Sequence, residues 1–362
     1  MTSVNSPFSE CLARGHAAPG ILISICIPTL NRARYLKEAI QSIAPQLSLD
    51  VELIVYDTGS TDGTREMMDG VTAVYPAVRY IRREEILSVD ETLLLLLGEA
   101  RGEYIWFFGS DDVLKPGAIE KVRSKITRTL VPPMLVYLNH EIVDLDGNLL
   151  IASQVRGNKD LQYAVGWRCV PQLGIKLGYI SASVVKRKRA AAVGDARDFV
   201  GSRWVSLHLY LSSLIAGGSV ELIAEPFIRA RRNPSACAEY AEVFVRQAAR
   251  VLRAAHGNGY PRHVVYRSMS RIIATQYLRF VVSWRADNPA ELARTFPVML
   301  RTCWTYPAFW LLLMPTRLAP PRLVRAVRDR LRDQRARRNG LSVELKPQQA
   351  EGERGTAGVV RA

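Results

Sequence analysis

Between residues 21 and 139, short apolar runs rich in β-branched residues alternate with longer stretches that carry apolar residues at helical spacing. The short runs predict buried strands at 21–27, 51–56, 78–81, 104–108 and 134–139. The longer stretches predict helices at 33–44, 64–75, 88–100 and 116–129. This alternation is typical of an α/β fold, with helices around a sheet.

Weaker signals continue the pattern. Ser88 followed by Glu91 predicts a capping box at a helix start, and Asp144-Leu-Asp-Gly147 predicts a tight turn between two strands. From 166 to 232 the pattern is irregular, with aromatic residues, glycines and basic clusters. After Pro234, apolar residues at spacings of three and four predict helices at 242–255, 262–284 and 289–301.

Composition indicates a globular chain, because 48% apolar and 23% charged residues are near ordinary usage. The net charge of +15, with arginine concentrated towards the C-terminus, favours a membrane surface, a nucleic acid or a phosphate-rich ligand as partner. The five cysteines are far apart and lack any C-x-x-C spacing, which argues against a disulfide framework or a zinc site and indicates a reducing compartment. Residues 1–20 hold no continuous apolar segment of a secretory signal, and we expect a flexible leader there.

Polar residues follow three of the predicted strands. They occupy 28–32 after the first strand, 57–62 after the second and 109–112 after the fourth. The carboxyl ends of parallel strands open onto one crevice, so we expect these side chains to converge. Asp111 and Asp112 fit a site for Mg²⁺ or Mn²⁺ bound to a diphosphate, which needs hard oxygen ligands. The alternative is a solvated turn in which Asp112 helps to cap the next helix.

Three runs carry a resemblance to a known family: ICIPTLNR at 25–32, ELIVYDTGSTDGT at 52–64 and GEYIWFFGSDDVLKPG at 102–117. In this order they resemble family 2 glycosyltransferases of the GT-A fold. The resemblance implies a Rossmann-like mixed sheet flanked by helices, here with a helical, basic C-terminal extension. It implies an inverting hexosyl- or deoxyhexosyltransferase that uses a nucleotide-diphosphate sugar donor and Mg²⁺ or Mn²⁺.

The resemblance also implies the site residues, and together with the composition along the chain it gives the expected domains. The metal ligands are expected to be Asp111 and Asp112. The expected donor-binding residues are Pro28, Thr29, Asn31, Arg32, Asp57, Thr58, Asp90, Ser110 and Asp111. We expect a leader at 1–20, a catalytic domain at 21–235, a helical membrane-associating region at 236–340 and a disordered tail at 341–362. Within the catalytic domain, 21–140 forms the nucleotide-sugar half and 141–235 the acceptor half.

Two departures from the family pattern affect the site. Gly109 and Ser110 precede the two aspartates where many relatives carry a further acidic residue, so metal affinity is expected to be lower. Thr58 stands where relatives often carry the aspartate that accepts from the uracil N–H. A hydroxyl donates as well as accepts, so a cytidine donor is a hypothesis for this chain.

The catalytic base is not marked by the Glu-Asp pair that family members often carry, because no such pair occurs between 166 and 232. Asp195, Asp198 and His208 are the available residues, and we predict Asp198 or His208 as the base. The alternative for His208, on an apolar helix, is a structural hydrogen bond.

A narrower resemblance is to the abequosyltransferase-like branch, through a glycine before the acidic motif and through the segments GYISAS at 178–183 and FVGSRW at 199–204. This implies a deoxysugar added to an O-antigen or exopolysaccharide unit, with a lipid-linked or polysaccharide acceptor.

The tail of the chain predicts membrane attachment. Residues 296–314 are rich in Leu, Trp, Tyr, Phe and Met but are interrupted by Arg301 and Pro307, which favours interfacial insertion over a spanning helix. Nine arginines then follow between Arg317 and Arg338, offset by Asp329 and Asp333. Leu323, Val324, Val327 and Leu331 give this stretch an apolar stripe. A polybasic helix beside an apolar insertion suits an anionic lipid surface, so we expect peripheral attachment at the cytoplasmic face of a bacterial inner membrane.

Three alternatives stay open at this point. The apolar and basic tail also fits a packed helix followed by a solvated charged one. A nucleic-acid-binding protein would explain the charge, but no stacking platform or reading helix accompanies the arginines, and no nucleic acid is expected as partner. A scaffold that has lost catalysis would explain the departures in the acidic motif and the missing base.

Overall fold

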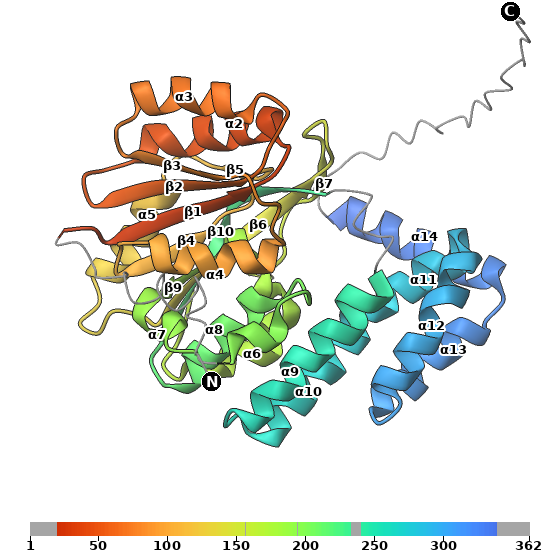
Figure 1. Ribbon diagram of the computed structural model, residues 1–362. Helices are drawn as coiled ribbons and strands as arrows, with labels where there is room; N and C mark the ends of the chain where they lie inside the picture. Colours follow the sequence, from red (N-terminus) through yellow and green to blue (C-terminus); the bar gives the residue numbers. More distant parts are fainter. Residues whose placement is uncertain (1–19, 156, 194, 233–239, 339–362) are drawn as a thin grey trace, which may run out of the picture.

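The computed structural model describes residues 20–155, 157–193, 195–232 and 240–338 (Figure 1). These residues form one ten-stranded sheet in the order β3-β2-β1-β4-β9-β6-β10-β5, with β7 beside β6 and β8 beside β10. The strands are β1 (Ile23–Thr29), β2 (Val51–Thr58), β3 (Val78–Arg83), β4 (Tyr104–Phe107), β5 (Val113–Leu114), β6 (Leu135–Val143), β7 (Leu149–Ile151), β8 (Leu161–Tyr163), β9 (Ser183–Lys186) and β10 (Val220–Arg231). The predicted leader and tail lie outside the described residues, apart from Gly20.

The direction of the strands positions the site. β1, β2, β3 and β4 are parallel to one another, and β10 is parallel to β6. β9 is antiparallel to both β4 and β6, so β4 and β6 run in the same direction. The strands β1, β2, β3, β4, β6 and β10 therefore all run in one direction. Their carboxyl ends therefore lie at one edge of the sheet, the carboxyl edge, where ligands bind in open α/β sheets.

Helices cover both faces of the sheet (Figure 1). Helices α2 (Ala33–Ile43) and α3 (Thr64–Val74) lie on one face, and α4 (Val89–Glu99) and α8 (Val205–Ile215) lie on the other. Helix α2 buries residues at spacings of three and four, which gives it one apolar face. Helix α4 is buried almost all round, because its five consecutive leucines are enclosed between the sheet and the second layer of helices.

Most predicted elements up to residue 151 are confirmed, with bounds that differ by a few residues. The capping box at the start of α4 is present in both halves, since Ser88 accepts from the backbone of Glu91 and the Glu91 carboxylate accepts from the backbone of Ser88. The predicted turn between β6 and β7 is also present, with Gly147 at a φ of 89°. Helix α5 (Ala118–Thr127) begins two residues after Pro116.

The segment 166–232 is more regular than its sequence indicates. It contains α6 (Val170–Leu173), β9, α7 (Arg187–Ala191), α8 and the twelve-residue strand β10. The alternation of β10 is broken around Pro226, where the register against β6 shifts on both sides. Proline donates no ladder hydrogen bond, so this irregularity hides a long strand from pattern reading.

The C-terminal region is helical, as predicted. It comprises α9 (Ala248–Gly257), α10 (Arg262–Ile272), α11 (Leu278–Asp287), α12 (Pro289–Cys303), α13 (Met314–Leu318) and α14 (Pro321–Arg338), with π-helical turns before α9, α11 and α13. α9 packs on α8, α10 packs on α6, and α14 packs on α11 (Figure 1). No helix among the described residues is both long and apolar enough to cross a bilayer. The predicted domain boundary at 235 falls among residues 233–239, outside the described ones.

Candidate active site

The loops that follow β1 and β2 are tied together at the carboxyl edge. Asn31 has a left-handed backbone, with a φ of 51°, and its Oδ1 accepts from the Thr61 backbone N–H at 2.8 Å. The Asn31 N–H donates to Ser60 Oγ at 2.9 Å. At the first residue of α2, the Ala33 N–H donates to Asp62 at 2.8 Å. The two polar motifs that the sequence separates by about 30 residues thus form one surface.

Asp57 is fully buried at the end of β2, and both of its oxygens are occupied. Oδ1 accepts from the backbone N–H and the hydroxyl of Ser60, at 2.9 and 2.6 Å. Oδ2 accepts from Tyr80 at 2.6 Å and from Arg82 at 3.5 Å. Asp57 therefore fixes the strand ends, and its role towards a nucleotide stays a prediction.

Two threonine hydroxyls beside Asp57 keep bonding capacity. Thr29 Oγ1, which follows the half-buried Pro28, is buried and has no hydrogen-bond partner among the described residues. Thr58 is 2% exposed, and its hydroxyl makes a long contact of 3.4 Å to the Thr29 carbonyl. Buried polar groups in proteins are nearly always paired, so these two hydroxyls are candidates for contact with a ligand.

The acidic motif after β4 divides into an inner and an outer carboxylate. Asp112 is 3% exposed and accepts from Tyr179 at 2.5 Å, from the Ser181 hydroxyl and from the Arg231 backbone N–H at 3.2 Å. Burial, together with the charge of Asp111, raises the pKa of Asp112 to about 7. Asp112 is thus the inner carboxylate, held by three donors.

Asp111 is the outer carboxylate. Its side chain is 24% exposed and forms an ion pair with the guanidinium of Arg32, which is 40% exposed. The contact joins the motif after β4 to the motif after β1. Ser110, which precedes Asp111, is buried.

The chemistry of this carboxylate pair fits a divalent cation that arrives with a diphosphate. No group of three or more His, Cys, Asp or Glu is arranged to hold a metal ion by itself in the part of the chain that the structure describes. Mg²⁺ is commonly held by one or two carboxylates plus substrate phosphates and water, so a larger protein cluster is not required. Asp111 offers an outward oxygen, and three donors leave Asp112 about one of its roughly four lone-pair positions.

The absence of a side chain at position 109 has a steric reason. A Cβ at this position would lie 2.6 Å from Asp112 Oδ2 and 3.2 Å from Asp111 Oδ1. The Asp112 oxygen is held by Tyr179 and Ser181 and has little freedom to move. Packing around Asp112 therefore explains why glycine stands where many relatives carry a further acidic residue.

Asp90 makes contacts that the sequence does not indicate. It is 1% exposed at the start of α4 and accepts from the backbone N–H groups of Arg203, at 2.7 Å, and Val205, at 3.3 Å. Burial raises the pKa of Asp90, against the effect of these hydrogen bonds. The carboxylate ties α4 to the first turn of α8, and its donor-binding role stays a prediction.

The two predicted bases lie in different settings. His208 is buried in α8, its Nε2 lies 2.8 Å from Asp195, and its ring stacks on Phe199 at 4.2 Å between centroids. Asp195 is thus a partner for the structural hydrogen bond that is the alternative role of His208. Asp198 is exposed in the short turn before α8. Neither role as base is tested by these positions.

Several residues of this edge were missed by sequence reasoning: Tyr80, Arg82, Tyr179, Ser181 and Arg231. Tyr179 and Ser181 lie within the segment that suggested the abequosyltransferase-like branch, which was the available signal. Arg231 lies on β10, whose strand character the sequence concealed.

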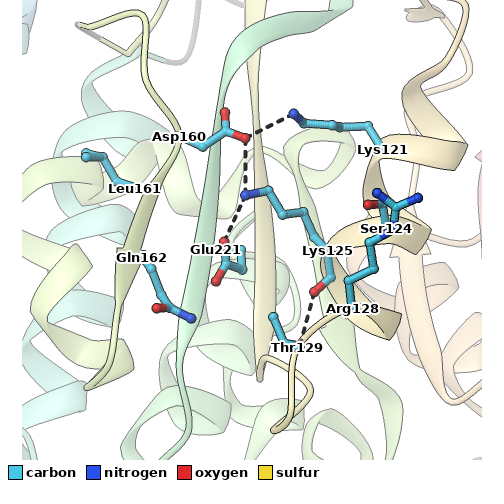
Figure 2. A pocket seen from close by; sticks show the side chains of 9 residues that line it. All are labelled: Lys121, Ser124, Lys125, Arg128, Thr129, Asp160, Leu161, Gln162 and Glu221. Carbon is cyan, nitrogen blue, oxygen red and sulfur yellow. Dashed lines mark hydrogen bonds and ion pairs between the residues drawn. The ribbon is translucent and has the colours of Figure 1, made fainter.

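A separate pocket of about 480 Å³ lies between α5, β8 and the beginning of β10, away from the carboxyl edge (Figure 2). Lys121 and Lys125 both pair with Asp160 at 3.1 Å, and Lys125 also pairs with Glu221 at 3.2 Å. These ion pairs connect three elements and neutralise the two lysines of the pocket. We assign the pocket a structural role.

Comparison with known proteins gives the site its family. The model of glycosyl transferase family 2 matches residues 24–131, which include all three polar motifs. An abequosyltransferase of Salmonella typhimurium is 28% identical over 231 residues, which cover 58% of this chain and 67% of that protein. A chondroitin synthase of Escherichia coli is 34% identical over 131 residues, or 36% of this chain and 18% of that larger protein.

Solved structures share the fold. The S. aureus TarS fragment 1–349 in complex with UDP-GlcNAc superimposes with a TM-score of 0.57 at 15% identity, over 88% of this chain and 92% of that one. A Pyrobaculum calidifontis mannosyltransferase in complex with GDP-Man and Mn²⁺ gives a TM-score of 0.50 at 15% identity, over 86% of each chain. The sheet, its flanking helices and the helical extension confirm the predicted GT-A architecture, residues 24–131 match glycosyl transferase family 2, and the chain is similar to an abequosyltransferase.

Proposed function

We propose that this protein is an inverting glycosyltransferase that moves a sugar from a nucleotide-diphosphate donor to a lipid-linked or polysaccharide acceptor in cell-surface glycan synthesis. The observation that carries the proposal is the contact of Arg32 with Asp111, which brings the motifs after β1 and β4 together at the carboxyl edge. The similarity to an abequosyltransferase and to a chondroitin synthase supports a glycan product.

The donor would lie across the ends of β1, β2 and β4. The hydroxyls of Thr29 and Thr58 would meet the nucleobase, because the Thr29 hydroxyl has no partner among the described residues and the Thr58 hydroxyl makes only a long contact. Asn31, Arg32 and Ser110 lie further along the same edge, where the diphosphate would follow. A guanidinium suits phosphate oxygens because its donors form a planar fork.

Asp111 and Asp112 would hold a divalent cation together with the donor diphosphate. When bound, Mg²⁺ or Mn²⁺ offsets the negative charge that develops on the departing nucleoside diphosphate. The protein contributes one outward and one inward carboxylate, and Arg32 supplies a further positive charge beside the leaving group.

Inversion requires a base that deprotonates the acceptor hydroxyl on the face of the sugar opposite the diphosphate. Asp198 and His208 are our proposals for this base. Separate Asp198→Ala and His208→Asn variants, assayed at saturating donor, separate them, because loss of the base lowers the rate of transfer and leaves donor affinity unchanged. The anomeric configuration of the product, read by NMR, tests inversion.

The C-terminal helices would attach the enzyme to an anionic membrane surface. Phe309 and Leu313 are fully buried in the helical region, whereas Trp310 is 48% and Leu311 73% exposed. Trp304, at the end of α12, is 60% exposed. This division gives the predicted insertion segment an outward apolar side, and the arginines of α14 follow it in the chain. Attachment would bring a lipid-linked acceptor to the enzyme.

A screen of nucleotide sugars against the purified full-length protein tests the function. We expect at least one donor to be hydrolysed or transferred in the presence of Mn²⁺, and the activity to be lost in Asp111→Asn. If no nucleotide sugar binds or turns over with Mn²⁺ or Mg²⁺, the transferase proposal is wrong and the scaffold alternative gains support.

A further inference from the structure

The last residue of β10, Arg231, reaches the acidic motif from a distant part of the chain. It is separated from Asp111 by 120 positions in the sequence. Its backbone N–H donates to Asp112 Oδ1 at 3.2 Å, and its Nη1 donates to the backbone carbonyl of Asp111, also at 3.2 Å. One residue thus bonds to both members of the carboxylate pair.

The other contacts of Arg231 hold its guanidinium in one place. Nη2 forms an ion pair with Glu38 of α2, and the guanidinium carbon lies 5.0 Å from the centre of the Tyr35 ring. The side chain is 9% exposed. A guanidinium that is buried, paired and stacked on an aromatic ring has few alternative rotamers, so it can set the position of the groups that it bonds.

Arg231 and Arg32 act on different atoms of the same turn. Arg32 contacts the Asp111 carboxylate, which would face the cation and the diphosphate. Arg231 contacts the Asp111 carbonyl and the Asp112 carboxylate, on the inner side. The side chain of Arg231 therefore makes no contact with the outward oxygen of Asp111, and its effect on that oxygen passes through the backbone.

We propose that Arg231 is a positioning residue that sets the geometry of Asp111 and Asp112 for the cation and the donor diphosphate. The proposal rests on the proposed function, because it assigns Arg231 to the same site. It predicts that the fork of the guanidinium matters, since a lysine keeps the charge beside Glu38 but offers a single point donor and loses the planar pair of contacts.

The test compares Arg231→Met and Arg231→Lys with a control in the same strand, Arg229→Met. Arg229 is 55% exposed and pairs with Glu141 at 2.7 Å, and among the described residues its side chain forms no hydrogen bond or ion pair with Asp111 or Asp112. Mn²⁺ affinity is measured by the EPR signal of free Mn²⁺ in the presence of the nucleoside diphosphate that the wild-type protein binds. Thermal unfolding without metal or nucleotide reports stability separately.

We expect Arg231→Met and Arg231→Lys to weaken Mn²⁺ binding by about tenfold or more, as is typical when a residue that orients metal ligands is removed. Arg229→Met should bind Mn²⁺ as the wild-type protein does. If Arg231→Met is folded and binds Mn²⁺ within about twofold of wild type, against the loss expected for an orienting residue, Arg231 has no positioning role. Equal weakening in Arg231→Met and Arg229→Met would also overturn the proposal.

The two proposals fail in different ways. If the wild-type protein binds no nucleoside diphosphate with Mn²⁺, the proposed function fails before Arg231 is tested. If the wild-type protein binds and the Arg231 variants bind equally well, only the inference on Arg231 is lost. Should Arg231→Met fail to fold, Glu38→Gln provides the second variant, because it releases Nη2 and leaves Arg231 itself in place.

Discussion

The guanidinium of Arg32 forms an ion pair with the carboxylate of Asp111, although 79 positions separate them in the sequence. Arg32 ends the polar motif after β1, and Asp111 lies in the acidic motif after β4, whose strands are neighbours in the sheet. The positive charge of Arg32 thus already occupies the outward carboxylate to which a divalent cation would bind. If a cation binds there as proposed, cation and arginine would compete for one oxygen in the absence of donor.

This competition predicts that loss of Arg32 strengthens cation binding and weakens donor binding. Arg32→Gln should bind Mn²⁺ more tightly than wild type in the absence of nucleotide, because Asp111 loses its fixed positive neighbour. The same variant should show a higher dissociation constant for the donor, because the proposed diphosphate contact is lost. Isothermal titration with Mn²⁺ and with donor measures both. Arg34→Gln is the matched control, since Arg34 is 79% exposed and has no contact with Asp111. Weaker Mn²⁺ binding in Arg32→Gln would contradict the competition between Arg32 and the cation.

The base preference can be tested at Thr58. A threonine hydroxyl can donate to the ring nitrogen of cytosine, which is an acceptor, whereas the ionised aspartate of many relatives can only accept, as a uracil N–H requires. In a thermal-shift panel with Mn²⁺ and CDP, UDP, GDP or dTDP, we expect CDP to stabilise the protein most. Thr58→Val should weaken CDP binding by about fivefold to tenfold, the value of one hydrogen bond. No stabilisation by CDP would remove the hypothesis.

The fold was readable from the sequence wherever the pattern was local. Strands β1 to β4 and helices α2 to α4 follow from apolar runs, helical spacing and the Ser88–Glu91 capping box. Strand β10 was not, because Pro226 breaks its alternation and its partners on β6, such as Leu135 for Val220, lie more than 80 residues earlier. The partners of Asp112 lie just before β9 and at the end of β10, so strand order rather than composition brings Tyr179 and Arg231 to the acidic motif.

Gly109 gives a prediction on stability. Gly109→Asp would restore the acidic residue that many family members carry, yet its Cβ would collide with the fixed oxygen of Asp112. We expect Gly109→Asp and Gly109→Ala to lower the free energy of unfolding by roughly 1–3 kcal/mol, as overpacking does, and to weaken Mn²⁺ binding. Gly70→Ala is the control, because a Cβ in α3 at that position meets nothing within 4 Å. Urea unfolding measures the free energy of unfolding, and the EPR signal of free Mn²⁺ measures the binding. Tighter Mn²⁺ binding in Gly109→Asp would show that the position is vacant for another reason.

The buried carboxylate of Asp90 predicts a dependence of stability on pH. Burial raises the pKa of Asp90 in the folded protein, while an unfolded aspartate titrates near about 3.9. Between these two pKa values the folded protein binds more protons, so this contribution to stability is full below the unfolded pKa and falls as pH rises through the folded pKa. Asp90→Asn lacks this titration. The difference in unfolding free energy between wild type and Asp90→Asn should therefore shift against the wild type as pH rises from about 4, which urea unfolding at several pH values measures. An unchanged difference would place the pKa of Asp90 at its ordinary value.

Membrane attachment predicts separable apolar and electrostatic contributions. The outward side chains of Trp304, Trp310 and Leu311 would enter the lipid interface, while the arginines of α14 would lie over anionic headgroups. We expect the full-length protein to float with liposomes that contain phosphatidylglycerol and to be released by high salt, because each basic residue near such a surface contributes about 1 kcal/mol that salt screens. Replacing Trp310 and Leu311 by serine should weaken binding at every salt concentration, whereas replacing Arg322 and Arg330 by glutamine should lower binding mainly at low salt.

Val74→Ser is the control, since Val74 is 68% exposed at the end of α3, in the catalytic domain. Equal binding to neutral and anionic liposomes would rule out the electrostatic part, and binding to DNA without binding to liposomes would favour a nucleic-acid partner instead.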